Sequence, residues 1–283
     1  MICSLNLTKK GSGQEVATAS LIEKTANHGA HLLELRNCAR ALQLSYADSL
    51  RLAAVDYGNR LRFQHPRRIR LKSGAFVVVR HWADILILRE VFTGVYELPL
   101  SRATRILDLG ANIGISAIYF NQRFPDATIA CVEASPQNQP FLAENIQANR
   151  ISARVFRAAI SDTGGNLVLA WDGDGSCQVP SSQYTSLVDV PAMTVPDVLR
   201  EMKWDRLDLL KIDIEGGERR VLHVNNDWLS LVSVIAGEIH ECYSPENLRN
   251  DLEPFGFKLQ ISNPTKYGQA TFIGAKPASD SRP

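Results

Sequence analysis

The stretch that decides the fold of this chain reads Arg105-Ile106-Leu107-Asp108-Leu109-Gly110-Ala111-Asn112-Ile113-Gly114. An apolar strand runs into a glycine-rich turn, and a helical pattern starts directly after the turn. A second apolar run, 127–132, ends at Glu133. Glycines let a ligand approach the backbone closely, and an acid at the tip of the neighbouring strand accepts hydrogen bonds from ribose hydroxyls. The turn and Glu133 together therefore predict a pocket for a nucleoside.

The spacing of the glycines indicates which nucleoside the pocket takes. Dinucleotide-binding folds carry G-x-G-x-x-G, in which the second glycine lets a pyrophosphate rest on the helix N-terminus. Here the glycines are Gly110 and Gly114, Asn112 stands between them, and Asp108 precedes the turn. An acid at that place repels a pyrophosphate but suits a cationic ligand with an ammonium group. We therefore expect S-adenosylmethionine, which carries a sulfonium and an α-amino group, rather than NAD. An ordinary tight turn would explain the glycines but not Glu133.

The composition is that of an ordinary globular protein and argues against several classes of partner. Of 283 residues, 45% are hydrophobic and 22% are charged, with a formal net charge of +1. So small a charge gives no electrostatic basis for binding nucleic acid. No apolar run approaches the roughly 20 residues of a membrane span, and no signal-peptide pattern begins the chain. The five cysteines are scattered, as in reduced proteins. We therefore expect a cytoplasmic protein with no membrane and no nucleic-acid partner.

Residues 1–75 are predicted to form a helical N-terminal extension that ends in the start of a β-hairpin. Apolar residues recur at three- and four-residue steps over 15–59, and Ser45 is the expected N-cap of a second helix. The period changes to two over 68–79, with Gly74 at the turn of the hairpin. The apolar stripe of the helices predicts a lid or a homodimer interface.

Residues 76–283 are predicted to form the catalytic domain, which is an α/β fold. A helix is expected over 82–97, stopped by Pro99, and strands and helices alternate from residue 104 onward. The expected strands are 105–109, 127–132, 153–158, 207–213, 231–239, and a closing hairpin of 258–262 with 270–274. A short pair, 166–170 with 187–193, interrupts the alternation. This order predicts a doubly wound, Rossmann-like sheet of seven strands, mostly parallel, that ends in an antiparallel hairpin and binds ligands at the carboxyl ends of its strands.

Two pairs of ionisable residues follow the last two parallel strands. Asp213 and Glu215 are two positions apart, so on an extended backbone they point to the same side. Crowded carboxylates repel, so a proton, a metal ion, Lys211 or the sulfonium must offset them. Glu238 and His240 also share one side, and an adjacent carboxylate raises the basicity of a histidine. We therefore expect His240 to be the general base that removes a proton from a substrate hydroxyl.

The same four residues allow a second interpretation, because hard carboxylates with one imidazole suit Mg²⁺ or Mn²⁺. No metal ligand is assigned from the sequence, and a divalent metal stays an alternative. Glu218 begins the next helix, and the attraction of a helix N-terminus for an acid explains it equally well.

Three motifs in this chain resemble those of a known family. They are Asp108-Leu109-Gly110-Ala111-Asn112-Ile113-Gly114, Lys211-Ile212-Asp213-Ile214-Glu215-Gly216-Gly217-Glu218 and Glu238-Ile239-His240. In this order the chain resembles the FkbM family of S-adenosylmethionine-dependent methyltransferases, whose hallmarks are D-x-G-A-N-x-G, K-x-D-x-E-G-x-E and E-x-H. The resemblance spans residues 75–275 and implies the fold of the class I methyltransferases.

The resemblance also implies roles for the matching positions. Donor binding falls to Asp108, Gly110, Ala111, Asn112, Gly114, Ser116, Glu133, Ser161, Asp162 and Asp213. Asp108 would help to receive the amino group of the donor, Ser116 would bond its carboxylate, and Glu133 would hold the ribose hydroxyls. Ser161 and Asp162 would meet the adenine edge, or they form a simple turn. The catalytic set expected from the residues at the two strand ends is His240, Glu238, Asp213 and Glu215.

The function that the resemblance implies is O-methyl transfer to a hydroxyl, rather than a carboxyl, of a small-molecule acceptor such as a sugar or natural product. Residues 80–98 and 171–191 would build the acceptor pocket. Two alternatives are an NAD(P)-dependent oxidoreductase, which the glycine spacing disfavours, and a non-catalytic adenosyl-binding module. Such a module would need neither Glu238 nor His240.

Overall fold

The computed structural model of the chain describes residues 33–60, 66–94, 96–171, 177–178, 186–240, 243–265 and 269–277. The part of the predicted N-terminal helix before residue 33 lies outside the described residues. So does most of 172–185, within the segment expected to border the acceptor pocket.

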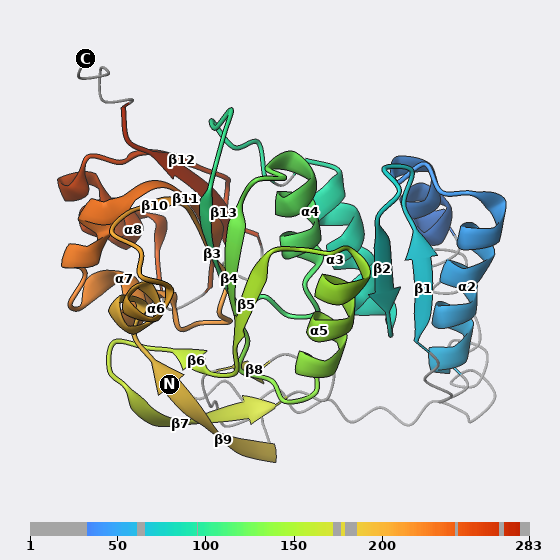
Figure 1. Ribbon diagram of the computed structural model, residues 1–283, viewed down its shortest axis with the longest axis horizontal. Coiled ribbons are helices and arrows are strands. Elements are labelled where there is room, and N and C mark those ends of the chain that lie inside the picture. The colour runs from blue at the N-terminus through green and yellow to red at the C-terminus, as the bar shows by residue number, and fades with distance from the viewer. Residues whose placement is uncertain are drawn as a thin grey trace, which may run out of the picture.

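Apolar strands pair into one seven-stranded sheet at the centre of the molecule (Figure 1). Its strands are β3 (Arg105–Leu109), β4 (Thr128–Val132), β5 (Ala153–Phe156), β10 (Leu207–Ile212), β11 (Val232–Ile239), β12 (Lys258–Ile261) and β13 (Ala270–Ala275). Their order is β12-β13-β11-β10-β3-β4-β5. The strands from β11 to β5 are parallel, and β13 is antiparallel to both β11 and β12. The predicted fold class, with its C-terminal antiparallel hairpin, is confirmed.

Helices cover both faces of this sheet, as expected for parallel strands that are apolar on both sides. One face carries α3 (Trp82–Phe92), α4 (Ile115–Arg123) and α5 (Gln139–Ala148), and the other carries α6 (Val195–Met202), α7 (Glu218–His223) and α8 (Pro245–Leu252) (Figure 1). Short 3₁₀ segments lie at Asp227–Leu231 and Glu253–Phe255. Neighbouring residues of one strand serve different cores, because Ile106 packs into the cluster with α3, α4 and α5, whereas Leu107 packs into the cluster with α6, α7 and α8.

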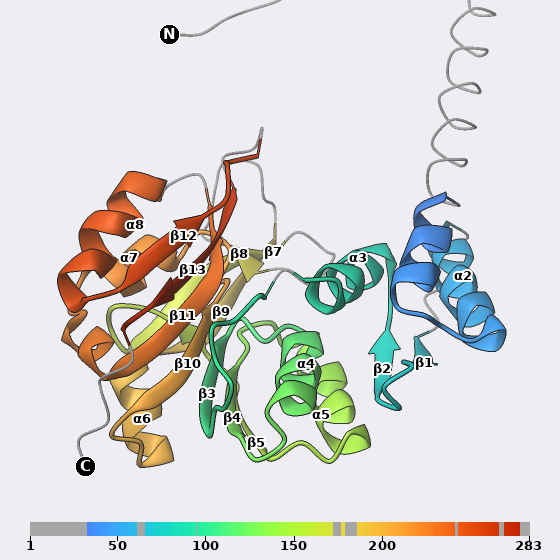
Figure 2. The ribbon, with the colours of Figure 1, turned by 90° about the horizontal axis from the view of Figure 1, so that it is seen from above.

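The N-terminal elements pack outside α3 and α5, at one end of the molecule (Figures 1 and 2). They are a helix over residues 33–41, α2 (Tyr46–Arg60), β1 (Arg67–Arg70) and β2 (Phe76–Val79). Ser45 caps α2 as predicted, because its Oγ accepts a hydrogen bond of 3.1 Å from the backbone N–H of Asp48. The predicted hairpin is confirmed by the antiparallel pairing of β1 with β2.

Asn145 of α5 and Asn149, the C-cap of that helix, fasten the hairpin to the domain. Asn145 Oδ1 accepts a hydrogen bond of 2.7 Å from the backbone N–H of Val78, and Asn149 Oδ1 accepts one of 2.9 Å from the backbone N–H of Phe76. The same two amide groups donate back to the carbonyls of these residues. These side chains thereby satisfy backbone hydrogen-bonding groups at the free edge of β2. They also fix the position of the hairpin relative to α5.

The helix expected over 82–97 is shorter than predicted. It ends at Phe92, where the backbone N–H of Thr93 closes the last turn on Arg89. Gly94 follows with a φ of +120°, a conformation that cannot continue a right-handed helix. The glycine, rather than Pro99, therefore ends the helix.

A second sheet of four strands follows β5. Its strands are β6 (Ala159–Ile160), β7 (Gly165–Trp171), β8 (Cys177–Gln178) and β9 (Ser186–Met193), in the order β6-β9-β7-β8. The predicted pair of 166–170 with 187–193 is confirmed as β7 with β9. The single strand expected over 153–158 is wrong, because β5 ends at Phe156 and the chain changes partners, so that β6 pairs with β9.

In the described part of the N-terminal helices, the large apolar side chains of Leu33, Tyr46 and Leu50 are exposed. The homodimer interface expected on these helices stays a prediction. Among the residues that the structure describes, no helix combines the length and the apolar character needed to span a bilayer.

A glycine in β11 lies in close contact with the backbone of the neighbouring strand β10. A Cβ at Gly237 would lie 1.8 Å from the carbonyl oxygen of Ile212 in β10. We expect Gly237→Ala to lower the free energy of unfolding by about 1–3 kcal/mol or more, as overpacking a core does, when measured by urea denaturation. Gly164→Ala is the matched control, because its Cβ would meet no atom nearer than 3.8 Å. Unchanged stability of Gly237→Ala would contradict this packing.

Candidate active site

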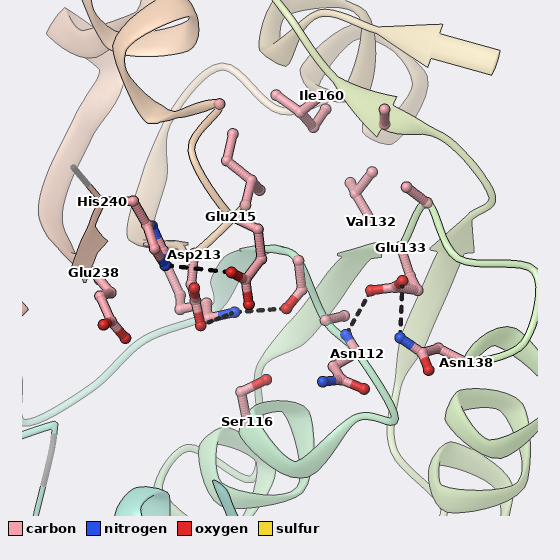
Figure 3. A pocket seen from close by; sticks show the side chains of 18 of the residues that line it. Asn112, Ser116, Val132, Glu133, Asn138, Ile160, Asp213, Glu215, Glu238 and His240 are labelled. Carbon is pink, nitrogen blue, oxygen red and sulfur yellow. Dashed lines mark hydrogen bonds and ion pairs between the residues drawn. The ribbon is translucent and has the colours of Figure 1, made fainter. Parts of the chain in front are cut away.

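The carboxyl ends of β3, β4, β10 and β11 border one pocket of about 270 Å³. Figure 3 shows polar side chains on two sides of it. The glycine-turn side carries Asn112, Glu133 and Asn138, and the acidic side carries Asp213, Glu215, Glu238 and His240. The backbone of Gly110 also borders the pocket. Residues of α3, β6 and β7 complete the wall. The topology therefore gathers at one place the residues that the sequence places far apart.

The glycines of the turn are required by the backbone geometry. Gly110 has a φ of +75°, and a Cβ there would lie 1.8 Å from the carbonyl oxygen of Asp213. Gly114 has a φ of +86° and begins α4, where a Cβ would lie 2.8 Å from Leu142 Cδ1. Asn112 also adopts a positive φ, of +50°. The turn thus brings β3 against the end of β10 with no side chain between them.

Glu133 follows β4, and its buried carboxylate faces the pocket. Oε2 accepts a hydrogen bond of 2.7 Å from the backbone N–H of Asn112. Oε1 accepts a bond of 2.8 Å from the backbone N–H of Ser135. It accepts another of 3.2 Å from Nδ2 of Asn138 (Figure 3). Burial raises the pKa of Glu133 and these hydrogen bonds partly oppose that rise. The carboxylate is held in one orientation, with its face toward the cavity.

Lys211 is a buried cation between the two sides of the pocket. Its Nζ donates to the carbonyl oxygens of Leu109 and Gly110, at 3.2 and 2.6 Å. It lies 3.4 Å from Asp108 Oδ1 and 3.7 Å from Asp213 Oδ2. Burial alone would lower the pKa of Lys211, but these two carboxylates hold it well above its usual value. Lys211 therefore supplies the positive charge that the crowded acids need.

The acids of the K-x-D-x-E-G-x-E motif reach the pocket through a turn. β10 ends at Ile212, and Glu215 has a φ of +54°. Asp213 and Glu215 both border the pocket, but the extended backbone assumed for them from the sequence is wrong. The turn is held by the buried Glu218, whose carboxylate accepts the backbone N–H groups of Ile214 and Gly216.

His240 lies between two carboxylates. Its Nδ1 is 3.0 Å from Glu218 Oε1, and its Nε2 is 3.5 Å from Glu215 Oε2. Burial would lower the pKa of His240, but the hydrogen bond to Glu218 and the charges of Glu218, Glu215 and Asp213 raise it to about 9. The imidazole is therefore mostly protonated at neutral pH and serves as a cation in this site.

Glu238 is an acid of this site with a raised pKa. Burial and the negative charge of Asp213 raise the pKa of Glu238 to about 7, although His240 lowers it. A group with this pKa can accept and release a proton under physiological conditions.

A match to a known protein family distinguishes a methyltransferase from an NAD(P)-dependent oxidoreductase. The family described as the methyltransferase FkbM domain matches residues 108–259. The chain belongs to the FkbM family of S-adenosylmethionine-dependent methyltransferases. This membership decides against the NAD(P)-dependent oxidoreductase that the sequence left as an alternative.

Curated relatives of this FkbM-family chain are similar over most of their own length. Methyltransferase sdnD of Sordaria araneosa is 28% identical over 204 residues, which cover 59% of this chain and 78% of that protein. The 31-O-demethyl-FK506 methyltransferase FkbM of Streptomyces tacrolimicus is 26% identical over 212 residues, which cover 61% and 81%. Among solved structures, the methyltransferase FkbM from Methylobacillus flagellatus KT has a TM-score of 0.43 at 14% identity, covering 88% of this chain and 60% of that one.

Most of the residues predicted for the FkbM site border the pocket. They are Gly110, Ala111, Asn112, Ser116, Glu133, Ser161, Asp213, Glu215, Glu238 and His240. Three others do not border it. Asp108 lies behind the wall, where it accepts a hydrogen bond of 2.5 Å from Ser116 Oγ, Gly114 packs on α5, and Asp162 forms an ion pair of 3.0 Å with Arg220. The roles expected for all of these residues, whether or not they border the pocket, stay predictions.

Glu218 and Asn138 are among the polar residues of the site that have no assigned role in the sequence prediction. Glu218 is the last acid of the K-x-D-x-E-G-x-E motif, so the motif could have revealed it, although a helix N-terminus explained it equally well. Asn138 carries no such signal, because its position beside Glu133 depends on how the loop after β4 folds.

The residues that lie closest to metal-ligand geometry differ from the four considered from the sequence, because Glu218 takes the place of Glu215 and Glu238. Asp213, Glu218 and His240 each place one ligand atom within 4.8 Å of the others. Glu218, however, already accepts two backbone N–H groups and the imidazole N–H. The positive charge among these acids is supplied by the imidazolium and by Lys211.

The protonation of His240 predicts how the stability of the protein depends on pH. The pKa of His240, about 9, lies above the ordinary 6.5. The protonated imidazole therefore stabilises the folded protein fully below pH 6.5, and this stabilisation is lost as the pH rises through 9. At about 1.4 kcal/mol per pKa unit, the effect is on the order of 3 kcal/mol. We expect the difference in unfolding free energy between wild type and His240→Gln to shrink by this order between pH 6 and pH 10, in urea titrations.

Imidazole NMR signals give an independent check, with the His240→Gln variant assigning the resonance. We expect this resonance to titrate near pH 9 and to move toward 6.5 in Glu218→Gln. A resonance that titrates at or below 6.5 in the wild type would contradict the ion pairs of His240.

Proposed function

We propose that the protein transfers the methyl group of S-adenosylmethionine to a hydroxyl oxygen of a small molecule, such as a sugar or natural product. The observation that carries this proposal is that Glu238, with a pKa of about 7, borders the same pocket as the nucleoside carboxylate Glu133. A donor and a proton acceptor then meet in one cavity. This arrangement also argues against a non-catalytic adenosyl-binding module.

The glycine-turn side is proposed to hold the donor. The carboxylate of Glu133 would accept hydrogen bonds from the 2′ and 3′ hydroxyls of the ribose, and the close backbone approach at Gly110 would leave room for the methionine part. Asp213 would face the positive end of the donor. Family membership supports S-adenosylmethionine as the donor. The burial of Glu133 beside the pocket supports the proposal that the ribose of the donor lies against this carboxylate.

The chemistry needs alignment more than activation. The sulfonium already activates the methyl group, so the enzyme mainly orients an oxygen in line with the C–S bond and excludes water. The oxygen becomes a better nucleophile as its proton is removed, and the proton acceptor works best when its pKa is near the ambient pH. His240 was the base expected from the sequence, but its ring is mostly protonated at neutral pH. We therefore propose that Glu238, rather than His240, accepts the proton of the substrate hydroxyl.

The acceptor is proposed to enter between α3 and the acidic side. Ile87, Glu90 and Val91 of α3 border the pocket together with Tyr96 and Thr271, which places part of the expected segment 80–98 at the cavity. A relative named 31-O-demethyl-FK506 methyltransferase is by its name active on an O-demethylated compound, which supports an oxygen acceptor here.

Removal of the ribose carboxylate should weaken donor binding. We expect Glu133→Ala to bind S-adenosylmethionine about 10- to 100-fold more weakly in calorimetry, because hydrogen bonds to a charged group contribute about 1.5–3 kcal/mol. His240→Ala should keep near-wild-type donor affinity. Unchanged affinity of Glu133→Ala would exclude the proposed ribose contact.

The site of methylation can be tested with S-adenosylmethionine labelled in its methyl group. The purified protein is incubated with polyhydroxylated sugars, glycosides and polyketide alcohols, and with matched carboxylic acids and amines. We expect the label in an alkali-stable methyl ether, and the kcat/KM of the wild type to rise as the pH passes about 7. Glu238→Gln should lower kcat about 10²- to 10⁴-fold, whereas the exposed Glu246→Gln serves as a matched control without effect.

Two outcomes would contradict this proposal. Label found in amines or in alkali-labile esters alone would exclude O-methylation of a hydroxyl. Full activity of Glu238→Gln would exclude it as the base, and an inflection near pH 9 that His240→Gln abolishes would return that role to the histidine.

A further inference from the structure

We propose that Arg80 and Asp84, which precede the matched family domain, are positioning residues of the donor site and act on Glu133 through Asn138. The proposal rests on the ribose role of Glu133 in the proposed function. It assigns the hairpin and α3 a part in donor binding as well as in packing.

Arg80 and Asp84 form a buried ion pair at the junction of β2 and α3. Arg80 Nε donates to Asp84 Oδ2 at 2.9 Å, and Arg80 Nη2 donates to Asp84 Oδ1 at 2.8 Å. The backbone N–H of Arg80 also donates to Oδ2, at 2.7 Å. The exposed fraction is 7% for Arg80 and 0% for Asp84. This bidentate pair fixes the plane of the guanidinium.

The guanidinium has a further N–H group that points to Asn138. Arg80 Nη1 donates to Asn138 Oδ1 at 2.7 Å, and the guanidinium carbon lies 5.0 Å from the centre of the Phe141 ring. Arginine has no acceptor atom, so the carboxamide of Asn138 must turn its oxygen toward Arg80. Its Nδ2 then faces Glu133 Oε1, at 3.2 Å.

The orientation of Asn138 matters because the opposite one would repel the carboxylate. If the carboxamide were flipped, Oδ1 would face Glu133 and two acceptors would meet in a buried place. The two other donors to Glu133 are backbone N–H groups, of Asn112 and Ser135, which the fold itself holds. The third donor is a side chain, and Arg80 selects its direction.

A buried ion pair is weak evidence for a purely stabilising role. Its desolvation often cancels its attraction, and apolar replacements are frequently as stable. Here Arg80 of the pair donates a hydrogen bond to Asn138, which borders the pocket. Asn138 in turn donates to the carboxylate of Glu133. The chain of contacts from Asp84 to Glu133 is therefore best explained by the geometry that the donor requires.

The test measures the affinity for S-adenosylhomocysteine by calorimetry in a double-mutant cycle. Two changes are each made in wild type and in Glu133→Gln. One is Asn138→Ala, and the other is the paired change Arg80→Met with Asp84→Leu, which removes both buried charges. We expect each to weaken binding about 5- to 30-fold in wild type, as the loss of an oriented hydrogen bond does, and less than about 2-fold in Glu133→Gln, since coupled residues are not additive.

Arg68→Met is the matched control. Arg68 also links the hairpin to α5, through an exposed ion pair of 3.0 Å with Glu144, and has no contact with Asn138. We expect its affinity to equal that of wild type. Thermal melting of every variant shows that it is folded, and Asn138→Ala leaves the ion pair intact if the paired change does not fold.

The outcomes separate this inference from the proposed function. Equal losses in both backgrounds would mean that Arg80 and Asn138 affect binding independently of Glu133, which would overturn the inference. Full affinity of Asn138→Ala and of the paired change, together with weak binding by Glu133→Gln, would also overturn it and leave the ribose contact standing. Full affinity of Glu133→Gln would instead remove the ribose contact on which both depend.

Discussion

The site depends on one buried cation, Lys211. Its ammonium group donates to the carbonyl oxygens of Leu109 and Gly110 and lies within 4 Å of the carboxylates of Asp108 and Asp213. These contacts join the end of β3 to the end of β10 at the point where no side chain fits between them. They also supply the charge that lets acids gather beside a pocket for a cationic donor. Without this cation, the same acids would repel one another or take up protons.

On the acidic side of the pocket, neighbouring charges give His240 and Glu238 different protonation states. His240 is held as a cation by Glu218 and Glu215, and it thereby becomes an electrostatic support for its neighbours. Glu238 lies near the negative charge of Asp213, and its pKa is raised to about 7. Two ionisable residues of one strand end thus differ in protonation because their surroundings differ, which is how sites commonly separate an acid from a base.

The sequence predicted the parts of this structure that local pattern determines. The turn around Gly110, the place of Glu133 after the next strand and the parallel order of the sheet follow from residue type and spacing. The protonation of His240 could not be predicted, because it depends on a glutamate that the fold brings to its other nitrogen. Arg80 and Asn138 were also beyond prediction, since their contact joins segments 58 residues apart without any motif.

A crystal structure of the protein with S-adenosylhomocysteine, the donor after loss of its methyl group, would show directly where the nucleoside lies relative to Glu133. The ribose hydroxyls should lie within about 3.2 Å of the Glu133 carboxylate, with the sulfur directed toward Asp213 and Glu238. A nucleoside bound elsewhere, or one whose ribose points away from Glu133, would contradict the assignment of the pocket.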